Sequence, residues 1–251
     1  MSIKGSVILV TGAANGIGLA TAKRFAAGGA RVVMSDIDRE RGEAEVQELR
    51  EQSYDARFAY CDVGDPDSID QLFAHLDSEL GRLDFAFNNA GIEGNLVPID
   101  TSDPSDWDRI IAINLSSIYH CMRHEIPMLR QAGGGAIINC SSIAGLVGTQ
   151  GGGMYCATKH GVIGITRATA LDVARDKIRV NAICPGAIDT LMVQRAVGAN
   201  PDLRSVIEEM QPIGRMGTAE EIASAVYWLC QPDAALVTGI ALPLDGGWTA
   251  R

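Results

Sequence analysis

The chain has 251 residues, of which 47% are hydrophobic, and it carries a formal net charge of -10 at pH 7. A surface of that sign repels nucleic acid and anionic lipid, so neither is expected as a partner. No stretch approaches the roughly 20 unbroken apolar residues of a membrane span, and the first residues lack the charged-then-apolar layout of a signal peptide. A cytoplasmic protein is therefore expected.

Apolar, strand-like runs alternate with amphipathic segments along the whole chain. The predicted strands cover residues 7–11, 31–36, 57–62, 83–89, 136–140, 178–184 and 240–243. The predicted helices cover residues 16–27, 40–51, 66–80, 106–131, 155–175 and 219–229. Such repeated strand–helix–strand units predict an α/β fold, a Rossmann-type doubly wound parallel sheet with helices on both faces.

The sequence shows no linker, low-complexity tract or repeat period, so a single domain over residues 1–251 is expected. The least regular region runs from 187 to 216 and contains two glycines and two prolines. A long interruption before a late helix is often a functional lid, and we expect this segment to cover the substrate.

Cysteine and histidine spacing offers no metal-ligand pattern. No two of the six cysteines form a CxxC pair, and they are typical of small buried residues in a reducing compartment. His120 and His124 lie four residues apart on a predicted helix, but no third ligand follows nearby. We therefore expect no metal site.

A glycine-rich turn with the sequence TGAANGIG, residues 11–18, joins the first predicted strand to the first helix. Glycines there permit a tight turn in which backbone N–H groups approach a pyrophosphate, and the helix N-terminus adds a favourable dipole. Because the turn lies directly between a strand and a helix, it predicts dinucleotide binding rather than an ordinary turn.

Asp36, at the predicted end of the second strand, indicates which dinucleotide is bound. A carboxylate there accepts hydrogen bonds from the adenosine ribose hydroxyls and repels the extra phosphate of NADP. Asn15 is neutral, so the loop offers no cation for that phosphate, and Arg39 and Arg41 fall where a helix should begin. The alternative is a helix-capping or loop acid, but the strand-end position favours NAD.

Tyr155 and Lys159 lie four residues apart on a predicted helix, which places them on one face. A free tyrosine has a pKa of about 10, and a nearby ammonium lowers that pKa by favouring the phenolate. Tyr155 can then exchange a proton with a carbonyl or alcohol oxygen, while the Ser142 hydroxyl bonds the same oxygen. The pair alone is a weak signal, but it follows the fifth strand of a predicted dinucleotide fold.

Several short motifs, in their order and spacing, resemble those of the classical short-chain dehydrogenase/reductase family over nearly the whole chain. They are the turn at 11–18, Cys61-Asp62-Val63, Asn88-Asn89-Ala90-Gly91, Asn114, Ser142, Tyr155-Cys156-Ala157-Thr158-Lys159 and Pro185-Gly186. The resemblance implies an NAD-dependent oxidoreductase that moves a hydride between nicotinamide and a secondary alcohol or ketone.

The resemblance also implies a role for each matching residue. Tyr155 matches the acid/base, and Lys159 matches the residue that tunes it and bonds the nicotinamide ribose. Ser142 matches the substrate-orienting serine, and Asn114 the helix residue that holds a water and links Lys159 to solvent. The implied cofactor-binding residues are Gly12, Asn15, Gly16, Ile17, Gly18, Asp36, Asp62, Val63, Asn89, Ala90, Gly91, Tyr155, Lys159, Pro185, Gly186, Ile188 and Thr190.

By position, the substrate should meet residues 92–96, residues 143–154 and the lid. The apolar candidates there are Leu96, Leu146, Val147, Met154, Leu191 and Met192, and the polar ones are Glu93 and Gln150. A mostly apolar pocket suits a small alicyclic, aromatic or steroid-like alcohol. The glycines at 151–153 either widen this pocket or form a plain turn. The first two segments hold no Arg or Lys, which argues against anionic substrates, although Arg195 lies in the lid.

Two other functions stay open at this point. One is an NADP-dependent 3-ketoacyl carrier-protein reductase, against which Asp36 counts. The other is a non-catalytic NAD-binding sensor or scaffold, against which the complete set of catalytic residues counts. The resemblance further implies a homotetramer, with one interface from helices 106–131 and 155–175 and another from residues 242–248.

Overall fold

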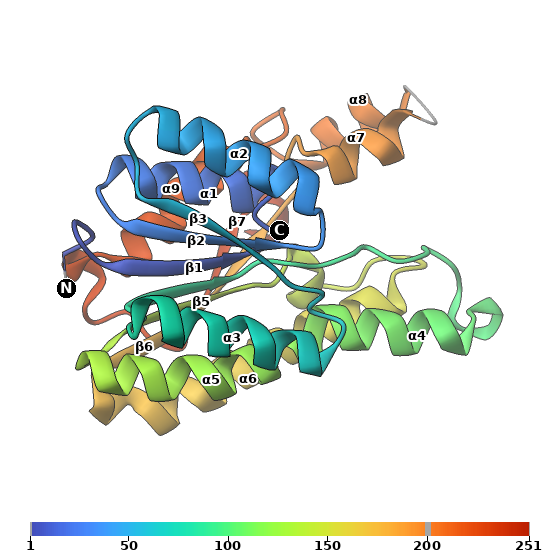
Figure 1. Cartoon of the computed structure of the whole chain (residues 1–251). Helices are drawn as coiled ribbons and strands as arrows, with labels where there is room; N and C mark the ends of the chain where they lie inside the picture. The colour runs from blue at the N-terminus through green and yellow to red at the C-terminus, as the bar shows by residue number, and fades with distance from the viewer. Residues whose placement is uncertain (1, 199–201, 251) are drawn as a thin grey trace.

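Within residues 2–198 and 202–250, which the computed structural model describes, seven strands form one sheet in the order β3-β2-β1-β4-β5-β6-β7 (Figure 1). Every neighbouring pair is parallel. The strands are β1 Val7–Thr11, β2 Arg31–Asp36, β3 Ala56–Tyr60, β4 Phe85–Asn88, β5 Gly135–Cys140, β6 Ile178–Pro185 and β7 Ala241–Leu244.

Helices cover both faces of the sheet, as Figure 1 shows. On one face lie α1 Gly16–Ala27, α2 Arg39–Glu51 and α9 Ala219–Cys230. On the other lie α3 Pro66–Leu80, α5 Ser117–Ala132 and α6 Gly153–Val173. The predicted doubly wound, Rossmann-type parallel sheet is therefore confirmed.

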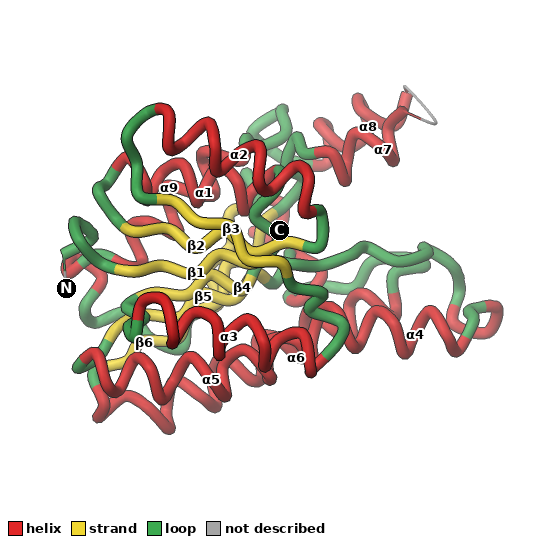
Figure 2. Tube along the Cα trace, in the orientation of Figure 1, coloured by secondary structure: helices red, strands yellow, loops and turns green. Residues whose placement is uncertain are grey.

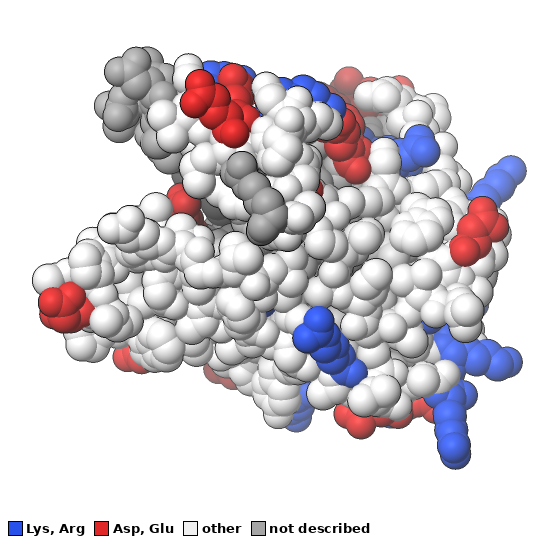
Figure 3. All heavy atoms as spheres, turned by 180° about the vertical axis from the view of Figure 1, so that it is seen from behind, with Lys and Arg blue, Asp and Glu red and all other residues white. Residues whose placement is uncertain are grey.

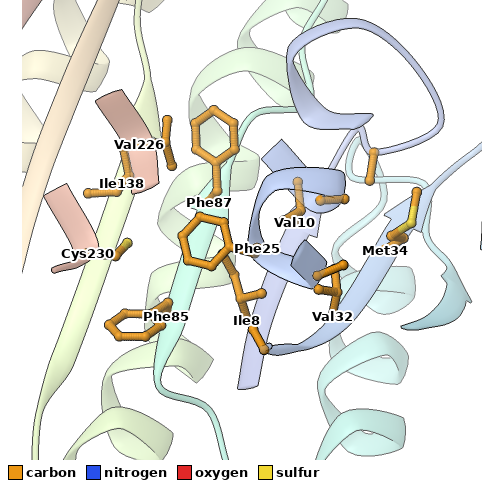
Figure 4. Packing of buried hydrophobic residues seen from close by; sticks show 14 of the residues in the cluster. Ile8, Val10, Phe25, Val32, Met34, Phe85, Phe87, Ile138, Val226 and Cys230 are labelled. Atoms are coloured by element: carbon orange, nitrogen blue, oxygen red, sulfur yellow. The ribbon is translucent and has the colours of Figure 1, made fainter. Parts of the chain in front are cut away.

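The two faces are sealed by two separate apolar clusters. Under α1 and α9, Phe25 and Val226 pack against the sheet residues Ile8, Phe87 and Ile138 (Figure 4). A second cluster forms beneath α3, α5 and α6. Because both faces are covered, all five residues of β1 are buried, and the strand has a continuous apolar run instead of an alternating pattern.

Helix starts follow from local capping chemistry. The Asp65 side chain accepts a hydrogen bond from the Asp67 N–H at the start of α3, whose first position is Pro66. Thr218 and Glu221 form a reciprocal capping box at the start of α9. The cap and proline of α3 explain why the predicted bounds 66–80 agree with the structure. The bounds 16–27 also agree, although Asn15 makes no side-chain cap. The strands predicted at 57–62 and 83–89 end at Tyr60 and Asn88.

The predicted helix over 106–131 is confirmed as one helical run, but its hydrogen-bond pattern is not α-helical throughout. The structure has α4 Pro104–Ile111, a π-helical turn over Ala112–Ser116, and then α5. Asn114 lies in the π turn, and its side chain bonds both backbone polar groups of Ile92. A π turn inside an α-helix is rare and depends on such tertiary contacts, so periodicity could not predict it.

The expectation that residues 187–216 are irregular is also wrong for most of the segment. Two helices, α7 Leu191–Gly198 and α8 Asp202–Met210, occupy it and lie apart from the sheet (Figure 2). Gly198 ends α7, and Pro212 and Gly214 follow α8, so these residues bound the helices and do not prevent them. The two ends of the segment lie side by side. The Gly217 N–H donates to the Ala187 carbonyl oxygen and the Asp189 N–H donates to the Gly217 carbonyl oxygen, both at 2.9 Å.

No helix in the described part of the chain is long and apolar enough to span a membrane.

Candidate active site

A cavity of about 370 Å³ opens at the carboxyl end of the sheet, where β1 and β4 are neighbours and the strand order reverses. Ligands of open α/β sheets bind at such a switch point. The predicted site residues that line the cavity are Gly12, Asn15, Gly16, Ile17, Asp36, Asp62, Val63, Asn89, Ala90, Gly91, Ser142, Tyr155, Lys159, Pro185, Gly186, Ile188 and Thr190. Two predicted residues, Gly18 and Asn114, do not line it.

The glycine-rich turn is fixed to the end of β4. The Asn89 side chain donates to the carbonyl oxygens of Thr11 (3.0 Å) and Gly12 (3.1 Å). Gly12 has φ +63°, and a Cβ atom there would lie 2.8 Å from the Ala90 Cα, so only glycine fits. A Cβ on Gly18 would collide with the Gly12 carbonyl oxygen. Gly18 therefore permits close packing of α1 and needs no contact with a ligand.

Asp36 is held in one orientation at the end of β2. Its two carboxylate oxygens accept hydrogen bonds from the Ala14 N–H (2.9 Å) and the Asp38 N–H (3.0 Å), and each keeps a second acceptor position. The cap of α2 is provided by Asp38, which accepts from the Arg41 N–H. Asp36 is therefore not the helix cap that the sequence left open as its alternative role.

Arg39, three residues after Asp36 in the sequence, already has partners inside the protein. The Arg39 guanidinium lies 3.4 Å from the Glu43 carboxylate and 5.1 Å from the centre of the Tyr60 ring. These contacts direct it along α2 and β3. At the same end of the cavity, Asp62 follows β3, the strand paired with β2, and accepts from the Gly64 N–H at 2.9 Å, which fixes the loop after β3.

Tyr155, Ser142 and Lys159 meet at the other end of the cavity. Lys159 Nζ lies 5.5 Å from the centre of the Tyr155 ring and donates to the Cys140 carbonyl oxygen at 2.8 Å. The side chain of Ser142 is hydrogen-bonded to Tyr155. The neighbouring Ser141 is buried and donates to the Lys159 carbonyl oxygen at 2.8 Å, so its hydroxyl is used inside the protein.

The electrostatics of this group differ from the prediction. Burial raises the pKa of Tyr155 well above its ordinary value, and the hydrogen bond with Ser142 opposes this only in part. The net shift is therefore opposite to the predicted lowering, because loss of water penalises the phenolate form. Burial also lowers the pKa of Lys159.

Asn114 does not line the cavity, but it bonds the backbone of Ile92, which does. It is fully buried, accepts from the Ile92 N–H at 2.8 Å and donates to the Ile92 carbonyl oxygen at 2.7 Å. Both ends of its amide are thus occupied. A Cβ atom on Gly91 would lie 3.2 Å from Asn114 Oδ1 and 3.6 Å from Lys159 Nζ, so the two side chains meet at this glycine.

The side chains predicted to contact the substrate differ in burial. Met154 is buried and Leu146 is half-buried, whereas Leu96, Val147 and Gln150 are exposed. Gly151 has φ +73° and Gly152 is the N-cap of α6, so the glycine stretch forms the turn that starts this helix. The side chains of Met192 and Arg195 lie outside the described residues.

Several residues that line the cavity were not predicted. They are Ile37, Cys61, Arg109, Ile113, Cys140 and Ser141, whereas Ile92 and Val193 lie in segments predicted to meet the substrate. Arg109 lies in α4, five residues before Asn114, which lies in the π turn that follows. An α-helical period does not place residues five apart on one face, so no sequence signal marked Arg109. In the described part of the chain, no group of three or more His, Cys, Asp or Glu side chains could hold a metal ion.

Comparison with known proteins agrees with the family resemblance seen in the sequence. The family model described as enoyl-(acyl carrier protein) reductase matches residues 12–249. The chain is 40% identical to a cis-4-hydroxycyclohexanecarboxylate dehydrogenase of Sinomonas cyclohexanicum, over 97% of this chain and 96% of that one. It is 38% identical to a cyclohexanol dehydrogenase of Acinetobacter sp. (strain SE19), over 98% and 95%. The solved structure of a levodione reductase superposes with a TM-score of 0.93 at 35% identity, covering 98% of both chains.

Proposed function

The chain belongs to the short-chain dehydrogenase/reductase family, and from this premise we propose that it is an NAD-dependent dehydrogenase of small alicyclic secondary alcohols. Members of the family act on CH–OH groups with a nicotinamide cofactor. The observation that carries the proposal is that one cavity holds Asp36 at one end and the Ser142, Tyr155 and Lys159 side chains at the other.

The residues present fit a dinucleotide. Gly16 has φ +53° and faces the Thr190 methyl group across the turn, at 3.3 Å from where a Cβ would lie. The first turn of α1 presents backbone N–H groups without helical partners, which suit a pyrophosphate. With the cofactor bound, the fixed carboxylate of Asp36 would accept hydrogen bonds from the adenosine ribose hydroxyls, and Lys159 would bond the second ribose. The bound cofactor would supply the hydride acceptor or donor.

Tyr155 is proposed as the group that exchanges a proton with the substrate oxygen. Its raised pKa keeps the phenol protonated, which is the form that gives a proton to a ketone. Alcohol oxidation needs the phenolate, and the ammonium of Lys159 acts in that direction. Ser142, hydrogen-bonded to Tyr155, is placed to bond the same substrate oxygen.

Asn114 is proposed as a positioning residue that holds Ile92 and supports Lys159. The family resemblance instead implies that Asn114 holds a water and links Lys159 to solvent. Its side chain bonds both backbone polar groups of Ile92, so a relay water would use the remaining acceptor position of its amide oxygen or its backbone carbonyl.

An alicyclic substrate is supported by the apolar residues Ile92, Ile113 and Val193 that line the cavity and by the cyclic substrates in the names of two relatives. The rival 3-ketoacyl carrier-protein reductase needs an NADP site, which the Asp36 carboxylate disfavours. A non-catalytic sensor would have no use for a serine, tyrosine and lysine brought together at the cavity end.

The experiment that tests the proposal follows the absorbance of the reduced cofactor with cyclohexanol and cyclohexanone, using NAD(H) and NADP(H) in parallel. NAD-linked turnover of the cyclic pair is expected. A clear preference for NADP together with reduction of an acyl thioester would support the carrier-protein reductase instead. Binding of NADH without turnover of any alcohol would favour the sensor.

The replacement Asp36→Ser is expected to lower kcat/KM for NAD by about 10- to 100-fold, because hydrogen bonds to a charged group contribute roughly 1.5–3 kcal/mol each. The rate with NADP is expected to rise, because the repelling charge is gone. Steady-state kinetics with both cofactors measures the ratio. Asp38→Ser is the control, since it removes the same charge two residues away and keeps a residue that can cap α2. An unchanged NAD/NADP ratio in Asp36→Ser would contradict the assignment.

A homotetramer is also proposed, with α5 and α6 in one interface and residues 242–248 in another. Exposed apolar side chains lie on these helices, among them Tyr119 (49% exposed) and Leu171 (82%). The face seen in Figure 3 carries few charged side chains over a broad area. Light scattering after size-exclusion chromatography is expected to give about four times the chain mass of 26.6 kDa, and Leu171→Glu is expected to reduce it. A monomeric mass for the wild type would exclude this assembly.

A further inference from the structure

The cavity wall includes an arginine that the proposed chemistry does not use. Arg109, on α4, lines the cavity, and its side chain is exposed. Among residues 2–198 and 202–250, no group forms a hydrogen bond or an ion pair with its guanidinium. Lys159, another cation on the wall, is buried and already donates to the Cys140 carbonyl oxygen. The guanidinium of Arg109 is therefore available to a molecule that enters the cavity.

The contacts of Ile113 show which end of the cavity Arg109 occupies. Ile113 lies four residues further along the same helical run and also lines the cavity. A Cβ atom on Gly64 would lie 3.2 Å from Ile113 Cγ1 and 3.1 Å from Asp62 Oδ1, so the Ile113 side chain reaches the loop after β3. Residues four apart on a helix are neighbours on its surface. Arg109 therefore extends the wall of the cavity at its β3 end.

The strand order determines which part of a dinucleotide reaches this end. In the sequence of neighbours β1, β2 and β3, the first strand leads into the glycine-rich turn, which suits the phosphates, and the second ends at Asp36, which suits the adenosine ribose. The base is joined to that same ribose, so the next position along the sheet is the loop after β3. There Val63 and Ile113 give the cavity two apolar sides, which suit a flat aromatic ring.

A guanidinium has the shape and charge to complete such a base site. It is planar, more weakly hydrated than an ammonium, and stacks on aromatic faces, including those of nucleic-acid bases. The two carboxylates at this end do not draw it away, because Asp36 accepts from the Ala14 and Asp38 N–H groups and Asp62 accepts from the Gly64 N–H. Neither carboxylate forms an ion pair with Arg109.

We propose that Arg109 is a cofactor-binding residue whose guanidinium stacks on the adenine ring and closes the outer side of the base site. The inference rests on the proposed function and deepens it, by assigning a residue to the adenine half of the cofactor. Because the stack recognises the base and not the 2′ position of its ribose, Arg109 should contribute equally to the binding of NADH and NADPH.

The test measures nucleotide binding, by titration of NADH and NADPH fluorescence and by displacement of NADH with AMP. Arg109→Ala is expected to raise the Kd for NADH by about 3- to 30-fold, and to weaken AMP binding by the same factor. Arg109→Lys keeps the charge but not the plane, and it is expected to lose most of the affinity that Arg109→Ala loses. The control Arg175→Ala removes an exposed guanidinium from the turn before β6, at the opposite edge of the sheet, and should change neither affinity.

Three outcomes would overturn the inference while the proposed function stands. Unchanged AMP binding in Arg109→Ala would place the side chain at the nicotinamide half of the cofactor. Full affinity in Arg109→Lys would mean that charge alone acts, without stacking. A larger loss for NADPH than for NADH would assign Arg109 to the ribose phosphate.

The two proposals can also fail in the other order. If no alcohol is turned over but Arg109→Ala and Arg109→Lys show the expected losses in binding, the dehydrogenase assignment fails and the role of Arg109 stands. A wild type that binds neither NADH nor AMP would refute both.

Discussion

Tyr155→Phe is expected to lower kcat for oxidation of cyclohexanol by about 10³- to 10⁴-fold, with little change in the affinity for NADH. The variant removes only the phenolic oxygen, which is the atom proposed to exchange a proton with the substrate. The ring, which packs beside Lys159 at 5.5 Å, is kept. The loss should therefore appear in kcat and kcat/KM alike, as for an interaction made in the transition state.

The measurement combines steady-state kinetics with NADH fluorescence titration on the same preparation. Tyr119→Phe is the matched control, because it removes the same atom from an exposed tyrosine on α5. Robust turnover by Tyr155→Phe would show that another group supplies the proton. Loss of NADH binding along with activity would show that the substitution disturbs the cofactor site, and the kinetic effect would then say nothing about proton transfer.

Glu125→Gln is expected to stabilise the protein at pH 8 by several kcal/mol. Glu125 is fully buried on α5, and its Oε2 accepts from the Asn88 side chain at 3.1 Å, while its Oε1 has no partner in the described structure. Burial raises the pKa of its carboxyl group to about 8, and the bond from Asn88 opposes this shift. The fold therefore favours the neutral form, which a glutamine reproduces at every pH.

The sign of the effect follows from proton binding. The pKa of Glu125 is about 8 in the folded protein, against an ordinary value of 4.5, so between these values the folded protein keeps a proton that the unfolded chain loses. The free energy of unfolding should fall with rising pH across this window, by up to about 1.4 kcal/mol per pH unit and about 5 kcal/mol in all. Below pH 4.5 this contribution is fully present, and above pH 8 it is lost.

Denaturant titrations of wild type and Glu125→Gln at several pH values between 4 and 9 measure the difference. The stability gained by the variant should grow with pH and level off near pH 8. Glu40→Gln removes the same charge from an exposed position on α2 and is expected to show no such trend. A stability difference that does not change with pH would mean that Glu125 titrates in the folded protein much as it does in the unfolded chain.

Glu125 also shows what sequence patterns leave out. From its position on α5 alone, Glu125 would be predicted to be a solvent-exposed acid. In the structure it joins a buried polar chain in which Asn88 donates to Asn139, and Asn139 donates to Thr166, both at 3.0 Å. Four elements, β4, α5, β5 and α6, supply these four side chains. No local window of the sequence contains that information.

The order of strands and helices, by contrast, was set by local patterns. The runs of β1 and β2 and the caps and breakers around α1 and α3 fix those elements to the residue. The spacing of the glycine-rich turn, Asp36 and the Tyr155–Lys159 pair already indicated a dinucleotide cavity with a proton-transfer group, and the structure brings all of them to that cavity. Periodicity and capping act within one or two turns, so the sequence alone reveals them.

Tertiary structure decided what depends on distant segments. The π turn at Asn114 depends on Ile92, which lies within reach of its side chain, and residues 187–216, expected to be irregular, contain two helices. The direction of the pKa shift of Tyr155 and the burial of Glu93 and Glu125 follow from what packs around each group. Desolvation is a property of the assembled environment, and a residue's neighbours in sequence do not determine it.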